Sequence, residues 1–169
     1  MQIIIEGLAL AAFQMLKSIT KDPLLKQLLH YVVRDEARHV TFGINYLEEF
    51  IKTLSPEEIE ERAQFAYEAC VISRERLINT KSEQRFLNMT EEEAREFQMS
   101  TASFAMFRNF LFSRVIPNLS RIGLLTDTVR PKFEALGLLE YEKAPDDFEC
   151  DWAEMKKPLE KFGQIPEAI

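Results

Sequence analysis

Short capping signals mark the starts of helices in this sequence, and they limit the fold more than any other feature. Asp22, a favoured N-cap residue, stands before Pro23, which suits the first position of a helix. The stretches SPEE (55–58) and TEEE (90–93) have the pattern of capping boxes. No segment shows the apolar–polar alternation of a strand, and the 169 residues include only five glycines. The sequence therefore predicts an all-α chain whose short connections make neighbouring helices antiparallel.

We expect these signals and the apolar periodicity to produce five helices, over residues 1–20, 23–54, 55–80, 90–117 and 128–136. Gly137 should end the last one in a left-handed conformation. The first two helices should form a hairpin over 1–54, with residues 55–140 packed on it in the same domain. Residues 141–169 should be an irregular acidic tail, anchored onto the bundle by Trp152.

The composition excludes several classes of partner. A net charge of −7 without a basic stripe argues against nucleic-acid binding. No apolar run approaches the roughly 20 residues of a membrane span, and no basic residue precedes the opening apolar run as in a signal peptide. Cys70 and Cys150 are far apart and are interpreted as free thiols in a reducing compartment. We therefore expect a cytoplasmic protein.

The stretch VVRDEARHVTFG places Asp35, Glu36, Arg38 and His39 in an otherwise apolar helical run. Glu36 and His39 are three positions apart, so they project from one face of the helix. A carboxylate and an imidazole at this spacing suit a divalent metal such as iron, manganese or zinc. Asp35 and Arg38 flank the pair, where they are expected to orient the ligands.

Glu6 is the only ionisable residue among the first sixteen, within a run of isoleucines, leucines and alanines. A buried carboxylate needs a cation, a proton or a hydrogen-bond donor. Fifteen residues separate Glu6 from the turn at Lys21, and thirteen separate Pro23 from Glu36. At about 1.5 Å per residue these are about 22 and 20 Å of helix. An antiparallel hairpin thus brings Glu6 level with Glu36 and predicts one metal site with His39.

The 3–4 spacing along the second helix predicts one inward stripe, made of Val32, Glu36, His39, Gly43 and Tyr46. Tyr46 is therefore expected to be a core residue rather than a redox-active one. His30, the only other histidine, precedes His39 by nine residues, which is about 180° around a helix. His30 is accordingly excluded from the site.

Glu6 and the string DEARH (35–39) together resemble the ferritin-like di-iron carboxylate superfamily. The string is most similar to the small subunit of class I ribonucleotide reductase and the bacterial multicomponent monooxygenases, with p-aminobenzoate-type N-oxygenases as another branch. The resemblance covers about residues 2–47. It implies a four-helix bundle in which two helices each supply a carboxylate and two each supply a Glu-x-x-His.

Carried over, the resemblance makes Glu6 the lone carboxylate of the third core helix, and Glu36 and His39 the ligand pair of the fourth. Asp35 would hydrogen-bond a metal-binding histidine on another helix, with Arg38 as its buried ion-pair partner. The implied cofactor is a di-iron centre, with manganese as the alternative metal. The implied activity is that of an oxidoreductase that activates dioxygen toward a small-molecule substrate.

The chain departs from the superfamily pattern because it contains no second Glu-x-x-His, and its only histidines are His30 and His39. One account is that this is the C-terminal part of such a protein, completed by a missing N-terminal half of the bundle. The other is a homodimer, in which two hairpins related by a two-fold axis supply the whole ligand set. Either account leaves an apolar inward face exposed on the single chain, so we expect an oligomer, most simply a dimer.

Simpler interpretations stand beside these hypotheses. The acidic residues of the predicted site could instead pair with Arg34 or Arg38 in a salt-bridge cluster. The whole chain could be a metal-free helical structural or interaction protein, or an iron-storage protein of the same fold. Glu68 lies seven residues from Glu61 and from Glu75, which favours a solvated face. The phenylalanine-rich run 99–112 could line a substrate pocket or an oligomer interface, but ordinary helix packing is favoured.

Overall fold

The computed structural model describes residues 2–144, so residues 145–169 of the predicted tail, including Trp152, lie outside the described residues. Within 2–144 the chain forms seven α-helices and one 3-10 helix and contains no strand, which confirms the all-α class. In chain order the elements are α1 (Gln2–Ile19), α2 (Pro23–Ile51), α3 (Pro56–Arg76), α4 (Lys81–Leu87), α5 (Glu91–Ser100), α6 (Ala102–Arg121), α7 (Arg130–Ala135) and η1 (Leu139–Lys143).

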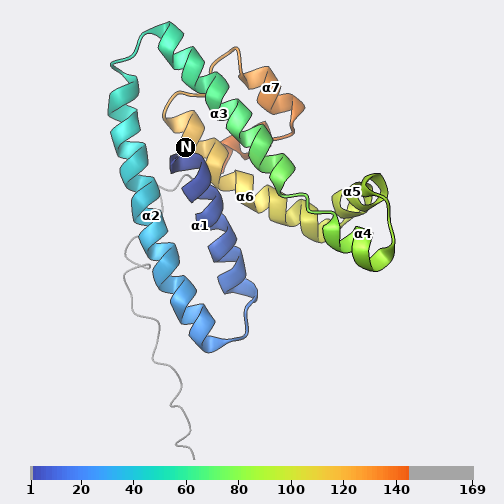
Figure 1. The fold of residues 1–169 in the computed structure, drawn as a ribbon. Helices are drawn as coiled ribbons and strands as arrows, with labels where there is room; N and C mark the ends of the chain where they lie inside the picture. The colour runs from blue at the N-terminus through green and yellow to red at the C-terminus, as the bar shows by residue number, and fades with distance from the viewer. Residues whose placement is uncertain (1, 145–169) are drawn as a thin grey trace, which may run out of the picture.

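The hairpin of α1 and α2 forms where the capping signal predicts it. Asp22 is the N-cap of α2, and its Oδ1 accepts hydrogen bonds from the backbone N–H groups of Leu24 (2.8 Å) and Leu25 (3.0 Å). These bonds satisfy two of the donors that a helix start leaves unpaired. The two helices run antiparallel, side by side (Figure 1), because only three residues connect them.

The two predicted capping boxes are also present. At the start of α3, the Ser55 N–H donates to Glu58 Oε2 (2.8 Å) and the Glu58 N–H donates back to Ser55 Oγ (3.2 Å). At the start of α5, Thr90 and Glu93 make the same exchange at 2.8 and 3.3 Å. Gly137 follows α7 with a φ of +69°, the left-handed conformation expected of it.

The predicted helix over 90–117 is wrong in two respects. It is broken at Thr101, whose extended backbone (φ −76°, ψ 133°) ends α5 and starts α6. The Thr101 hydroxyl accepts a hydrogen bond from the Phe104 N–H (3.4 Å), so Thr101 caps the new helix. Pro117 lies inside α6 instead of ending it. The proline removes one intrahelical hydrogen bond, but burial of Val115 and Leu119 on either side holds the helix together.

The ends of the other helices also differ from expectation. The second helix ends at Ile51 and the third at Arg76, and a separate helix, α4 (Lys81–Leu87), lies between the third helix and Thr90. The 3-10 helix η1 crosses the expected start of the tail at residue 141, and its Glu142 is held by Arg130 (2.7 Å).

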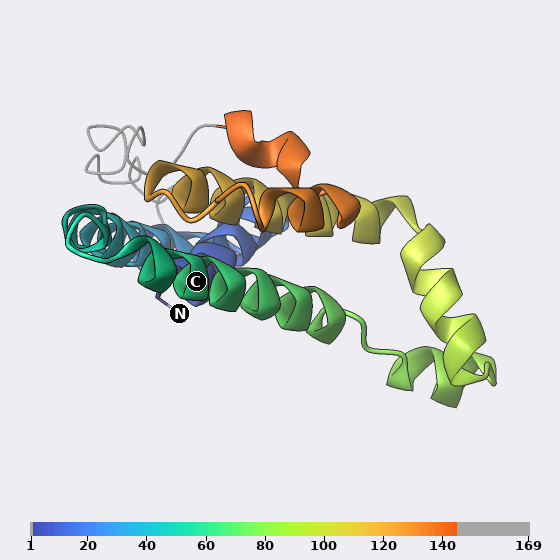
Figure 2. The same ribbon diagram turned by 90° about the horizontal axis from the view of Figure 1, so that it is seen from above.

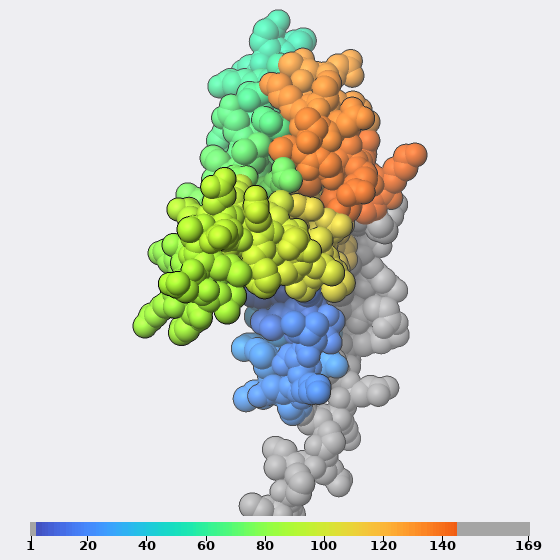
Figure 3. Space-filling view, turned by 90° about the vertical axis from the view of Figure 1, so that its right-hand side faces the viewer, coloured from blue at the N-terminus to red at the C-terminus, as the bar shows by residue number. Residues whose placement is uncertain are grey.

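The core lies where α1, α2, α3, α6 and α7 meet. Figure 2 shows α1 with α6 on one side and α3 on the other. The core includes six fully buried side chains, Leu10, Val40, Ile44, Phe112, Val115 and Phe133. α4 and α5 form an arm that projects from this core (Figures 1 and 2). The turn end of the α1–α2 hairpin, blue in Figure 3, extends past the other coloured helices. No described helix is long and apolar enough to cross a membrane.

Candidate metal centre

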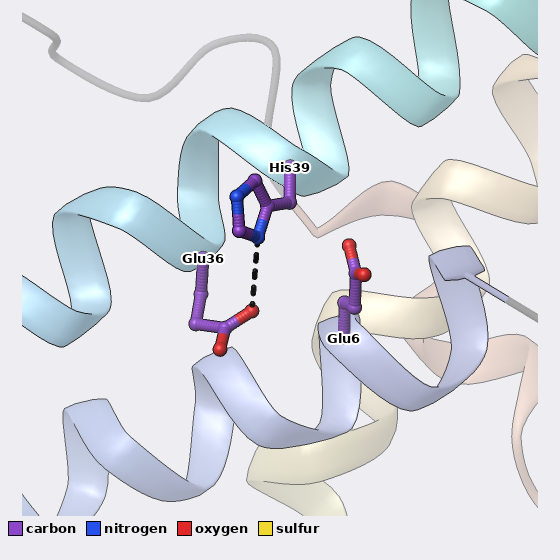
Figure 4. A group of neighbouring side chains, drawn as sticks. All are labelled: Glu6, Glu36 and His39. Atoms are coloured by element: carbon purple, nitrogen blue, oxygen red, sulfur yellow. Dashed lines mark ion pairs between the residues drawn. The ribbon is translucent and has the colours of Figure 1, made fainter.

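Glu6 from α1 meets Glu36 and His39 from α2 in one cluster (Figure 4). One ligand atom from each side chain lies within 4.8 Å of the other two. Within α2, Glu36 Oε2 is 3.7 Å from His39 Nδ1. The level predicted from helix rise alone is therefore correct. Among the described residues, this is the group of three acidic, histidine or cysteine side chains that approaches closely enough to hold one ion.

The cluster is lined by protein on one side and open on the other. Glu6 is half-buried, and its Oε2 is buried without a hydrogen-bond partner. The Glu36 side chain is 26% exposed and that of His39 is 61% exposed. An unsatisfied buried acceptor costs on the order of 1–3 kcal/mol, and this cost is removed when a cation binds it.

The donor set fits a divalent transition metal. Two carboxylates and one imidazole are borderline-to-hard ligands of the kind that iron and manganese accept. Ligand atoms about 2.0–2.2 Å from one ion lie roughly 3–4 Å from each other. The distance of 3.7 Å between Glu36 Oε2 and His39 Nδ1 lies in this range, and the distances to Glu6 are at most 4.8 Å. Because His39 is mostly exposed, its ring can turn toward the two carboxylates without disturbing the core.

The inward stripe predicted for α2 is wrong. Gly43 is buried, but Val32 and Glu36 are half-buried, and His39 and Tyr46 are exposed. The buried residues of α2 are instead Leu29, His30, Val33, Ala37, Val40, Gly43, Ile44 and Ile51. This face packs on α1 and the core, so the cluster lies at its edge. Tyr46, expected in the core, is 61% exposed and stacks on Phe50 with ring centroids 6.0 Å apart.

Asp35 and Arg38 form the ion pair that was expected, with Arg38 Nη1 3.0 Å from Asp35 Oδ1. Both side chains are more than half exposed rather than buried. Arg34 Nε also lies 3.6 Å from Asp35 Oδ1. Within residues 2–144, neither arginine forms an ion pair with Glu6 or Glu36, so the structure does not show the alternative salt-bridge cluster. The role of Asp35 and Arg38 in orienting ligands stays a prediction.

His30 is not part of the cluster, as its position on the helix predicted. It is buried, and its Nδ1 lies 3.1 Å from Nζ of Lys17. Burial lowers the pKa of Lys17, and the nearby charge of Lys26 lowers that pKa further. This pairing joins α1 to α2 nearer the turn than the cluster does.

The other interpretations of single residues hold in most cases. Glu61, Glu68 and Glu75 are exposed, as expected of a solvated face. Phe112 is fully buried and Phe104 is half-buried, as expected of ordinary packing. Cys70 is a buried thiol, and burial raises its pKa to about 12.

A cavity of about 370 Å³ was not anticipated from the sequence. It lies between the start of α1, the end of α2, α3 and the end of α6, and its apolar lining includes Ile3, Ile4, Phe50, Phe65, Ala66 and Leu119. Four helices contribute to it, so no local pattern could have indicated it. Ile3 is three residues before Glu6 on α1, which places the cavity about one helical turn from the metal cluster.

Comparisons of the chain with protein-family models, with curated proteins and with solved structures gave no match. The fold and the candidate site define the chain as an all-α protein with a carboxylate–histidine cluster between two antiparallel helices.

Proposed function

We propose that Glu6, Glu36 and His39 bind a divalent transition metal, and that the chain forms part of a di-iron oxidoreductase which activates dioxygen once further ligands complete the centre. Manganese is the alternative metal. The observation that carries the proposal is the convergence of a carboxylate from α1 with a Glu-x-x-His from α2 within 4.8 Å. The buried Oε2 of Glu6, which has no hydrogen-bond donor, supports it.

The residues of this chain would hold and tune the metal, while iron would supply the redox chemistry when bound. Glu6 and Glu36 balance the charge of a divalent ion, and His39 adds a neutral nitrogen donor. Metal and protons compete for all three groups, so affinity should fall as the pH is lowered. The open side of the cluster leaves coordination positions for ligands from a partner and for small molecules.

Metal content tests this proposal directly. Protein incubated anaerobically with Fe(II), and separately with Mn(II), should retain about one metal ion per chain after desalting. Glu36→Gln and His39→Ala should each abolish that retention. Glu49→Gln is the matched control, because Glu49 lies on the same helix but is exposed and paired with Lys52 (2.6 Å). Absence of any retained metal in the unmodified protein would overturn the proposal.

A metal-free helical interaction protein is the second candidate. It is favoured by the exposure of large apolar side chains on α2, among them Phe42 (68%) and Leu28 (57%). Exposed apolar groups of this size mark contact surfaces. This candidate predicts the same oligomeric state with and without metal, and no change in unfolding temperature when metal is added.

A further inference from the structure

α2 carries a second apolar face in addition to its buried one. We call it the outer stripe, and it consists of Leu24, Leu28, Val32, Phe42, Tyr46 and Phe50. Leu24 (72%), Leu28 (57%), Phe42 (68%) and Tyr46 (61%) are mostly exposed. At about 100° per residue, the six positions stay within roughly 80° of the helix surface. They form a row about 39 Å long, at about 1.5 Å per residue, in two apolar halves on either side of Asp35 and His39.

The residues of the outer stripe are spaced symmetrically about position 37 of α2. Leu24 and Phe50 are equally far from this position, as are Leu28 and Tyr46, and Val32 and Phe42. Each matched pair combines an aliphatic side chain with an aromatic one. An antiparallel copy of α2 would therefore bring every aliphatic residue of the row opposite an aromatic one, a pairing of smaller against larger side chains that fills space evenly.

The charged residues in the middle of the row select the direction of pairing. Asp35 and His39 lie two positions on either side of residue 37, with Arg38 beside His39. In an antiparallel pair, Asp35 faces the basic residues of the other helix. In a parallel pair, Asp35 would face Asp35 and Arg38 would face Arg38, and such like-charge contacts are unfavourable. Asp35, Arg38 and His39 are all exposed and available for this contact.

We propose that the outer stripe binds a second copy of this chain, with the two α2 helices antiparallel about a two-fold axis near residue 37. A two-fold contact joins one surface to itself, which the reversible spacing of this row satisfies. Six apolar side chains from each copy are covered, and Asp35 meets the partner's His39 and Arg38.

The same axis brings two metal clusters together. Glu36 and His39 lie within two positions of residue 37, so the clusters of both copies face each other across the axis. The partner's Asp35 then adds a third carboxylate beside His39, next to Glu6 and Glu36 of the same chain. This last step rests on the proposed metal-binding function, whereas the pairing of the two α2 helices does not.

Cysteine crosslinking tests the pairing and its direction. In a Cys150→Ser background, with Cys70 buried, a mixture of Leu28→Cys and Tyr46→Cys single variants is oxidised mildly. Antiparallel pairing predicts a covalent dimer in the mixture and none in either variant alone. In the antiparallel pair, position 28 of one copy lies about 27 Å along the helix axis from position 28 of the other, at about 1.5 Å per residue, and the same holds for position 46, so neither variant can crosslink with itself. Leu28→Cys mixed with Ile72→Cys is the control, because Ile72 is also exposed (54%) but lies on α3.

Light scattering on the Cys150→Ser parent completes the test, with circular dichroism to confirm that each variant is folded. We expect a dimer, and we expect Phe42→Glu with Tyr46→Glu to shift it to a monomer. A monomeric parent, a dimer without the mixed crosslink, or crosslinks in the single variants would each overturn the pairing. A monomer that retains metal would overturn the pairing of the α2 helices but would leave the proposed metal-binding function standing. A crosslinked dimer that retains no metal would overturn the metal-binding function but would leave the pairing standing.

Discussion

The surroundings of Glu6 are unfavourable for a carboxylate that has no ligand. Its Oε2 is buried without a donor, in a helix whose neighbouring side chains are apolar. A core-forming helix tolerates such a group when the group has a function, because an apolar residue would pack there at lower cost.

Replacing Glu6 by leucine separates stability from metal binding. Without metal, we expect Glu6→Leu to leave the free energy of unfolding unchanged or to raise it by about 1 kcal/mol, because an unsatisfied acceptor is removed. With Mn(II) present, the unmodified protein should unfold at a higher temperature and the variant should not. Thermal denaturation with and without Mn(II) measures both. A loss of stability in metal-free Glu6→Leu would show that Glu6 has a structural partner instead.

Three helices of this chain begin at positions set by a capping side chain at the helix start. Asp22, Ser55 and Thr90 each satisfy backbone donors of the helix that follows. These contacts are local, so sequence alone predicts them. The unpredicted break at Thr101 also has a local cap, but nothing nearby requires the chain to turn there. The turn results from packing, because α6 lies against α1 while α5 lies outside the core.

The capping box of α5 should make this helix sensitive to acid. Hydrogen bonds from the Thr90 N–H and hydroxyl lower the pKa of Glu93 below its ordinary value of 4.5. A lowered pKa means that the stabilising contribution is fully present above pH 4.5 and is lost as the pH falls through the lower folded value. Amide protection factors in α5 should therefore decline in that range.

Glu93→Gln is the matched variant for this prediction, since its amide oxygen can accept the same bonds but does not titrate. We expect its protection factors in α5 to be flat over the acid range in which those of the unmodified protein decline. An equal decline in both proteins would assign the acid sensitivity to other carboxylates.

At the scale of the whole molecule, stability comes from the core shared by α1, α2, α3, α6 and α7, and the α4–α5 arm adds little to it. Phe112 is fully buried, whereas Phe86 on α4 is 75% exposed. We expect Phe112→Ala to lower the free energy of unfolding by about 3–5 kcal/mol, and Phe86→Ala to change it by less than about 0.5 kcal/mol. Denaturant unfolding followed by circular dichroism measures both. Similar losses in the two variants would mean that the arm unfolds together with the core.

The sequence by itself determined the helical class, three helix starts and the common level of Glu6 and Glu36. Each depends on local hydrogen bonds or on a constant rise per residue across a short turn. Only the tertiary structure decided which face of α2 is buried. α2 has two apolar faces, and the contacts with α1 and the core bury the one that contains Ala37, Val40 and Ile44. That choice leaves His39 at the edge of the core and the outer stripe exposed, because packing against distant segments, and not periodicity, selects between two apolar faces.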